Sequence, residues 1–270
     1  MKIKEIKVSN YLTVSKLLNC DYVINPYVGC LHSCKYCYAC FMKRFTNHLE
    51  EWGEFIDIKQ CDKLIDLNKI KNKAVFLSSV TDCYNPAEEK YLITRNILKQ
   101  LVKADCELSI STKSKLILRD LDLLKKMKNL VVSISINTLD ESFKNDMDKA
   151  SSIADRLETL KILHNNGIKT ALFMSPIFPG ITDFKAIIEV TKEFVTEYWF
   201  ENLNLRASYK KTILEYIERK YPSLNKLYHE IYLLNNQSYW EKLSLEIELF
   251  CNENNIKYIN FFYHEKLVKK

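Results

Sequence analysis

Short apolar runs alternate with amphipathic stretches along the chain from residue 70 onward. The apolar runs predict strands over 74–79, 106–112, 130–137, 168–174 and 199–205, and a further short strand is predicted over 21–25. The strand starts from residue 74 onward recur at about the 30-residue spacing of a βαβ unit. Such alternation predicts a parallel sheet that is covered by helices.

Three helix starts are marked by capping residues. The sequence Asn-Pro-Ala-Glu at 85–88 suggests Asn as the N-cap, Pro in the first turn and Glu reaching back to the cap. A second helix is predicted to begin near Ser152 and to end at the Asn-Gly pair 166–167. A third is predicted to begin near Thr182. These helices fall between the predicted strands, as a βαβ arrangement requires.

Six strands in this order predict an α/β fold, an open and partial (β/α)6 barrel of the TIM type. A doubly wound sheet is the structural alternative, and periodicity alone does not separate the two. After residue 206 the pattern becomes mainly helical, with one further candidate strand over 256–262. We therefore predict a barrel over residues 1–206 and a helical C-terminal extension over residues 207–270.

The composition is that of an ordinary globular protein, with 270 residues, 47% hydrophobic and 27% charged. The net charge of +6 suits either a nucleic-acid partner or a solvated lysine surface. The first ten residues lack the apolar core of a secretory signal, and no apolar run approaches the ~20 residues that span a bilayer. We expect a cytoplasmic protein, in which clustered cysteines act as metal ligands or catalytic groups.

Four of the nine cysteines lie within residues 30–40. Cys30, Cys34 and Cys37 are separated by three and two residues, so their thiolates can converge on one metal centre. Three cysteines leave one iron of a 4Fe–4S cluster without a protein ligand, and an open position is what a catalytic metal needs.

Two other kinds of metal site stay open on spacing alone. Cys40 could complete a four-thiolate zinc site, or His32 could join three of the thiolates. The spacing of Cys34, Cys37 and Cys40 also fits a ferredoxin, although the fourth cysteine followed by proline is missing because position 44 is Arg. A closed site of either kind would indicate a non-catalytic nucleic-acid-binding module or an electron carrier.

The pattern Cys-x3-Cys-x-aromatic-Cys, with Tyr36 as the aromatic residue, resembles the signature loop of the radical S-adenosylmethionine (SAM) superfamily. Segments 76–86, 111–120 and 132–137 further resemble the branch that contains spore photoproduct lyase and, within it, the radical SAM mobile pair proteins. The resemblance covers residues 20–205 and is most specific in the cysteine loop.

This resemblance implies a set of cofactors and partners. Cys30, Cys34 and Cys37 would hold a 4Fe–4S cluster whose open iron binds SAM. Cleavage of SAM would yield a 5′-deoxyadenosyl radical that abstracts hydrogen from a substrate, either a nucleic acid, a peptide or a small molecule. An external electron donor such as flavodoxin or ferredoxin would be needed, and a second radical SAM protein is a candidate partner.

Polar residues along or just after the predicted strands, and one in the first turn of a predicted helix, are the candidate SAM contacts. They are Thr81, Asp82, Lys113, Ser133, Ser135, Asn137 and Arg156, and Tyr36 would place its ring against the cluster. An ammonium or guanidinium group can pair with the SAM carboxylate. The residues 133, 135 and 137 share one strand face that a ribose would satisfy. The alternatives are a surface lysine, a surface arginine and a serine-rich strand facing water.

One further cysteine adjoins the expected SAM site. Cys83 follows Asp82 and is a candidate donor of a hydrogen atom or a proton. Spore photoproduct lyase uses a cysteine donor near the end of its second strand, where this chain has Ser79. This departure argues against repair of the DNA photoproduct, and it leaves the cluster and SAM positions unaffected.

Overall fold

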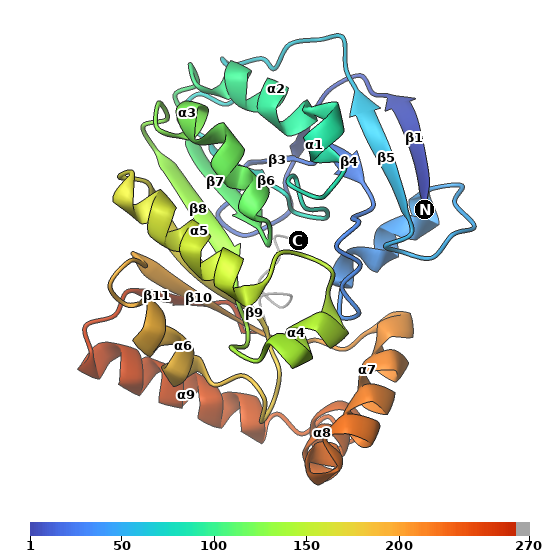
Figure 1. Ribbon diagram of the computed structural model, residues 1–270, viewed down its shortest axis with the longest axis vertical. Helices are drawn as coiled ribbons and strands as arrows, with labels where there is room; N and C mark the ends of the chain where they lie inside the picture. The colour runs from blue at the N-terminus through green and yellow to red at the C-terminus, as the bar shows by residue number, and fades with distance from the viewer. Residues whose placement is uncertain (263–270) are drawn as a thin grey trace.

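The computed structural model of the protein describes residues 1–262, apart from the side chains of Ala207 and Ser208. At its centre lies an eight-stranded sheet in the order β2–β3–β6–β7–β8–β9–β10–β11 (Figure 1). The strands from β3 to β11 run parallel, whereas β2 is antiparallel to β3. The strand bounds are β2 Leu12–Val14, β3 Tyr22–Ile24, β6 Ala74–Leu77, β7 Glu107–Thr112, β8 Leu130–Ser135, β9 Lys169–Ile177, β10 Glu197–Asn202 and β11 Tyr258–Asn260.

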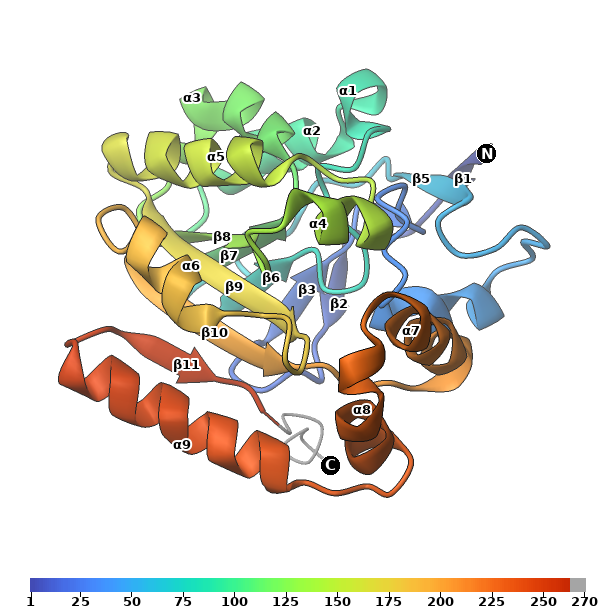
Figure 2. The same cartoon turned by 60° about the horizontal axis from the view of Figure 1, so that its bottom comes forward.

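Helices cover the outer face of this curved sheet (Figure 2). They are α2 Ile93–Leu101, α3 Leu121–Leu124, α5 Ile153–Asn165, α6 Phe184–Thr191 and α9 Ser238–Glu253. The short α1 Glu88–Tyr91 and α4 Glu141–Met147 lie toward one end of the sheet, and α7 Ala207–Lys220 and α8 Asn225–Tyr232 pack as a pair beyond it. The 3-10 segments are η1 Tyr38–Phe45, η2 Lys115–Asp120 and η3 Pro222–Leu224. In the described part of the chain, no helix is long and apolar enough to cross a membrane.

The order of the parallel strands separates the two predicted architectures. From β3 to β11 the spatial order follows the chain order without a reversal. A doubly wound sheet needs a reversal at which the helices change faces. The open, partial barrel is therefore confirmed, and the doubly wound alternative is wrong. The candidate strand over 256–262 contains β11, which adds one parallel strand to the six predicted ones.

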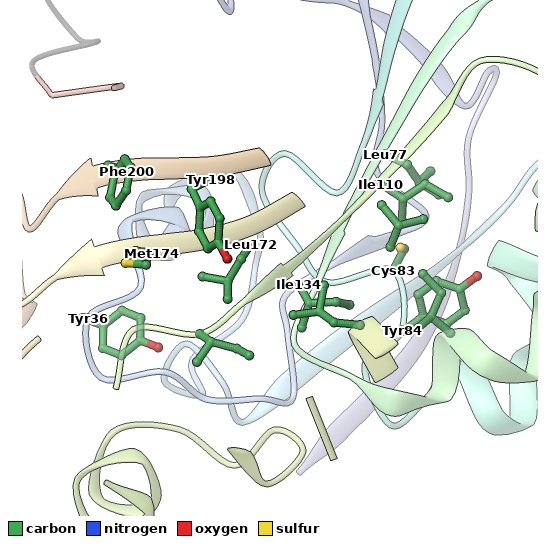
Figure 3. Packing of buried hydrophobic residues seen from close by; sticks show 14 of the residues in the cluster. Tyr36, Leu77, Cys83, Tyr84, Ile110, Ile134, Leu172, Met174, Tyr198 and Phe200 are labelled. Carbon is green, nitrogen blue, oxygen red and sulfur yellow. The ribbon is translucent and has the colours of Figure 1, made fainter. Parts of the chain in front are cut away.

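Alternate residues of the strands form the core beneath the helices. On β8 the side chains of Val132 and Ile134 are fully buried, and on β9 those of Leu172 and Met174 are as well. Figure 3 shows Ile134, Leu172 and Met174 in the same apolar layer. Burial of such a side chain contributes about 1.5–3 kcal/mol. Packing in this layer holds the strands in place relative to one another, and it thereby positions the polar residues that follow their carboxyl ends.

A second sheet, which the sequence pattern did not predict, lies beside the barrel. It has the order β1–β5–β4, with β1 at Lys2–Lys7, β4 at Tyr27–Val28 and β5 at Phe55–Gln60. The strand β1 is mostly exposed and reads as a charged stretch, whereas the first four residues of β5 are buried. Because β4 immediately precedes the cysteine loop, this small sheet anchors one side of the loop.

The Asn-Pro-Ala-Glu turn adopts a different cap from the predicted one. The N-cap of α1 is Ala87 rather than Asn85, and the Asn85 side chain instead forms a local turn by accepting a hydrogen bond from the Ala87 amide at 3.0 Å. The left-handed conformation of Leu92 (φ +55°) splits the predicted helix into α1 and α2. The Glu88 carboxylate therefore points toward the start of α2 rather than back toward Asn85. It accepts from the Thr94 amide at 2.8 Å and so caps α2.

The other two predicted helix starts are confirmed. Ser152 caps α5 by accepting from the Asp155 amide at 3.1 Å, and Gly167 follows the helix with a φ of +75°. Asp183 caps α6 one residue after the predicted start at Thr182. The segment after residue 206 is mainly helical, and its β11 pairs with β10, while residues 263–270 of the predicted extension lie outside the described residues.

Candidate functional site

The four clustered cysteines lie in a loop at the carboxyl edge of the parallel sheet. The loop is built from successive tight turns, in which the carbonyls of Cys30, Cys34 and Cys37 each accept from the amide three residues later. These bonds are 3.3, 3.2 and 3.3 Å long. Parallel α/β barrels place their active sites at this edge. The turns thus gather the thiols at the end of the barrel where a cofactor is expected.

The thiols of Cys30, Cys34 and Cys37 lie close enough to influence each other's ionisation. Burial raises the pKa of Cys30 well above its usual value, and the neighbouring charges of Asp82, Cys34 and Cys37 add to the rise. Burial also raises the pKa of Cys34, to about 12. Three thiolates in this loop therefore require a compensating positive charge, which a bound iron cluster would supply.

Cys40 is the fourth cysteine of the loop. Burial raises its pKa, and the charge of Cys37 adds to the rise. Within residues 1–262, no three His, Cys, Asp or Glu side chains are arranged to hold a single metal ion. This holds for Cys30, Cys34 and Cys37 as much as for a set that includes Cys40, so it does not separate an open site from a closed one. His32 is turned toward Asp82, with Nε2 at 3.1 Å from Oδ2.

The Asp82 carboxylate ties the cysteine loop to two strand ends. Its Oδ1 accepts from the Thr112 hydroxyl at 2.7 Å and the Tyr84 amide at 2.8 Å, and its Oδ2 accepts from the Lys113 amide at 2.9 Å. Burial acts to raise the pKa of Asp82, but the charge of His32 and these hydrogen bonds outweigh it and lower the pKa to about 2. Asp82 is thus a buried, ionised anchor with few free lone pairs.

A second buried carboxylate, Asp148, supports the aromatic residue of the loop. It accepts from the Tyr36 hydroxyl at 3.2 Å and from the Arg156 guanidinium at 2.6 Å. Arg156 also donates to the carbonyls of Ser151 and Ser135, at 2.9 and 3.2 Å. Burial opposes ionisation of Asp148, but the charges of Arg156 and Lys113 prevail and lower its pKa. The guanidinium predicted to meet a SAM carboxylate is therefore committed to protein groups.

Lys113 is the predicted contact that faces the cysteine loop with a charged group. Its Nζ lies 5.6 Å from the centre of the Tyr36 ring. Its charge opposes the rise that burial causes in the pKa of Cys34 and Cys37. Within the described residues, Nζ forms no ion pair with a carboxylate. The ammonium is thus positioned to neutralise an anion near the three thiols.

The remaining predicted contacts have mixed surroundings. Thr81 donates to the Gly29 carbonyl at 2.6 Å, and Ser133 donates weakly to the Ile110 carbonyl at 3.4 Å. The Asn137 side-chain amide donates to the Pro176 carbonyl at 2.9 Å and so ties the segment after β8 to the end of β9. The Ser135 hydroxyl is almost buried and forms no hydrogen bond within the described part of the chain. Ser135 is therefore the member of this set whose side chain has unused bonding capacity.

Cys83 lies in the apolar core rather than in the site. Its side chain has 0% exposure, and Figure 3 shows it among Leu77, Ile110 and Tyr84. Burial raises the pKa of its thiol well above the usual value. The predicted donor role would require this buried thiol to become accessible to a substrate, and it stays a prediction. Ser79, four residues earlier, accepts from the Asn25 amide at 2.9 Å.

Two residues of the site were missed in the sequence. Asp148 sits between two helices in a polar segment without a recognisable motif, and only its partner Arg156 stood out. Trp52 lies after the loop, and its indole nitrogen donates to Cys37 Sγ at 3.3 Å. A tryptophan shortly after a cysteine cluster does not by itself indicate a contact with a cysteine, because the residue that its indole meets depends on how β5 packs against the loop.

Comparisons with known proteins agree with this arrangement. The sequence profile described as the radical SAM superfamily matches residues 24–191. An uncharacterized protein of Methanocaldococcus jannaschii is 42% identical over 82% of this chain and 85% of its own length. An uncharacterized protein of Mycobacterium tuberculosis is 24% identical over 78% of this chain and 67% of its own length.

Solved structures share the fold at low sequence identity. Spore photoproduct lyase complexed with a dinucleoside spore photoproduct has a TM-score of 0.58 and 16% identity, over 81% of this chain and 66% of that one. Streptococcus suis SuiB bound to S-adenosylmethionine has a TM-score of 0.57 and 16% identity, over 88% of this chain and 49% of that one. This chain thus spans just under two thirds of the lyase and about half of SuiB.

The Asp82 anchor predicts an acid-sensitive contribution to stability. Its folded-state pKa of about 2 lies below the unfolded value, so the contribution is complete above pH 5 and is lost as the pH falls toward 2. Asp82→Asn should therefore lower the free energy of unfolding at pH 7 by about 2 kcal/mol, and the difference from the wild type should shrink at pH 3. Urea unfolding of the metal-free protein measures both. An equal difference at the two pH values would contradict the anchor role.

Proposed function

The chain belongs to the radical SAM superfamily, and from this premise we propose that it binds a 4Fe–4S cluster through Cys30, Cys34 and Cys37 and uses SAM for radical chemistry. The observation that carries the proposal is the group of three neighbouring thiols, one buried and two partly buried, at the carboxyl edge of the sheet. When bound, the cluster and SAM supply a 5′-deoxyadenosyl radical that removes a hydrogen atom from the substrate.

The chain's own residues divide into two roles in this proposal. Asp82 and Asp148 hold the cysteine loop in place, through His32 and Tyr36 respectively. Lys113 supplies a positive charge for the SAM carboxylate, since its Nζ lies beside the Tyr36 ring and has no carboxylate partner within residues 1–262.

The polar face of β8 completes the SAM side of the site. Ser135 offers a hydroxyl to the ribose, and Thr81 and Asn137 shape the adjoining backbone through their hydrogen bonds to carbonyls. Ser133, which lies at the buried end of the same face, remains a proposed SAM contact. Arg156 is proposed to act indirectly, through its hydrogen bonds to Asp148 and to the Ser135 carbonyl, rather than by touching SAM.

Of the three substrate classes, a nucleic acid is favoured by an aromatic patch that follows the cysteine loop. The patch consists of Arg44 and the aromatic residues Tyr38, Phe41 and Phe45. These three aromatic residues are 56%, 40% and 66% exposed, respectively. The Arg44 guanidinium lies 4.6 Å from the Phe45 ring centre and 5.5 Å from that of Phe41. Exposed rings with an interleaved cation bind single-stranded nucleic acid by base stacking, and the net charge of +6 assists it.

The rival functions require a closed metal site. A non-catalytic nucleic-acid module or an electron carrier would use all four cysteines, whereas the proposed open site uses Cys30, Cys34 and Cys37 and leaves Cys40 out. The proposed enzyme needs an external reductant, for which flavodoxin or ferredoxin is the expected class, and a cytoplasmic location suits its oxygen-sensitive cluster. Cys83 and Ser79 argue against a lyase that relies on a cysteine donor at this strand end.

Substitution of the cysteines tests the cluster directly. After anaerobic reconstitution, the wild type should contain iron and sulfide and should release 5′-deoxyadenosine with dithionite and SAM. Alanine at Cys30, Cys34 or Cys37 should abolish both properties, whereas Cys40→Ala is the matched control and should retain them. Iron analysis and chromatography of the products give the result. Loss of the cluster in Cys40→Ala, or zinc in place of iron in the wild type, would refute the proposal.

Lys113 tests the SAM site separately from the cluster. A hydrogen bond to a charged group contributes about 1.5–3 kcal/mol, so Lys113→Ala should weaken SAM binding by roughly 10- to 100-fold while iron content stays the same. The matched control is Lys115→Ala, because Lys115 is exposed and pairs with Asp155 at 3.1 Å. Anaerobic equilibrium dialysis measures the affinity. Equal affinities of Lys113→Ala and the wild type would exclude the assignment.

The aromatic patch predicts where a nucleic acid would bind. Stacking contributes about 1–3 kcal/mol per base, so Phe45→Ser should weaken binding of a labelled single-stranded oligonucleotide by roughly 5- to 100-fold. Leu249→Ser removes an exposed apolar side chain from α9 and serves as the control. Fluorescence anisotropy at fixed salt concentration measures the binding. Undiminished binding by Phe45→Ser would direct the search toward a peptide or small-molecule substrate.

A further inference from the structure

The thiol of Cys37 receives a hydrogen bond from outside its own loop. The indole Nε1 of Trp52 lies 3.3 Å from Cys37 Sγ and donates to it. In the described part of the chain, neither Cys30 nor Cys34 receives a side-chain hydrogen bond at sulfur. The indole thus distinguishes one of the three proposed iron ligands from the other two.

Trp52 is held in this position by the small sheet. The edge of its ring packs against Phe55 with centroids 5.8 Å apart, and Phe55 stacks on His48 at 3.9 Å. His48 is in turn fixed by Asp57, whose Oδ1 lies 2.8 Å from Nε2. This chain of contacts gives the indole little freedom to turn away from the sulfur.

Two glycines allow the segment that carries Trp52 to approach the cysteine loop. Gly53 has a φ of +99°, and a Cβ atom there would lie 2.5 Å from Ser33 Oγ. Gly29 has a φ of +92°, and a Cβ atom there would lie 2.5 Å from the Phe55 carbonyl oxygen. The close approach of this segment to residues 29–33 is therefore built into the backbone.

A hydrogen bond to a sulfur ligand stabilises the more negative state of an iron–sulfur cluster. Hydrogen bonds to the sulfurs are among the factors that set the reduction potential of such clusters. The reduced cluster carries one more electron, and its ligand sulfurs are then stronger acceptors. An indole N–H at Cys37 therefore makes one-electron reduction more favourable than it would be without the donor.

We propose that Trp52 is a positioning residue that raises the reduction potential of the cluster by donating a hydrogen bond to Cys37 Sγ. This inference rests on the proposed function, because it requires the cluster on Cys30, Cys34 and Cys37. It goes beyond that function by assigning control of electron acceptance to the small sheet, which contributes none of the three ligands. The electron itself comes from the external reductant.

The test compares Trp52→Phe with Trp199→Phe in the reconstituted protein. Trp199 is the matched control, because its half-buried indole donates to Glu197 at 2.7 Å on β10, away from sulfur. Potentiometric titration followed by electron paramagnetic resonance should give a more negative midpoint potential for Trp52→Phe, and one close to that of the wild type for Trp199→Phe. Equal potentials for Trp52→Phe and the wild type, with iron content retained, would overturn the proposal.

A second measurement observes the hydrogen bond itself. Electron–nuclear double resonance of the reduced wild type in H2O and D2O should show an exchangeable proton coupled to the cluster, which Trp52→Phe loses and Trp199→Phe keeps. Loss of iron in Trp52→Phe would assign the residue to cluster retention and overturn the tuning role. Absence of any cluster signal in the reconstituted wild type would instead refute the proposed function, so the two failures are distinguishable.

Discussion

The buried carboxylate of Asp82 is the contact on which the candidate site depends. It receives hydrogen bonds from Thr112 and Lys113 at the end of β7, and it faces His32 in the cysteine loop. An unpaired carboxylate in this position would be strongly disfavoured, and its partners are what keep it ionised. Because it joins the sheet to the loop, its geometry transmits the positions of the strand ends to the thiols.

A balance of charge around the loop follows from this arrangement. Buried thiols resist ionisation, and Asp82 and Asp148 add negative charge close to them. Lys113 and Arg156 offset part of that charge, and Trp52 adds a neutral donor at Cys37. The loop therefore has few cations of its own and needs the positive charge of bound iron to stabilise its thiolates. This requirement links cluster binding to the order of the loop.

The sequence predicted the features that depend on local pattern, and it missed those that depend on docking. Apolar runs located most of the parallel strands, because at least alternate residues of β6 to β10 are buried. The strand β1 was not predicted because it is mostly exposed and rich in lysine, so it lacks an apolar pattern. It forms a strand by pairing with β5, some fifty residues away in the sequence. For the same reason Trp52 was overlooked, since its contact with Cys37 exists only once β5 has docked on the loop.

The polar residues at the strand ends illustrate the same distinction. Asp82, Arg156 and Asn137 were predicted as SAM contacts, yet each forms hydrogen bonds with protein groups. Lys113 and Ser135 differ because the protein leaves Nζ and the hydroxyl without such partners in the described part of the chain. A residue type and a position are therefore insufficient to assign a ligand contact. Unused bonding capacity is the stronger criterion, and it ranks Lys113 and Ser135 first among the proposed SAM contacts.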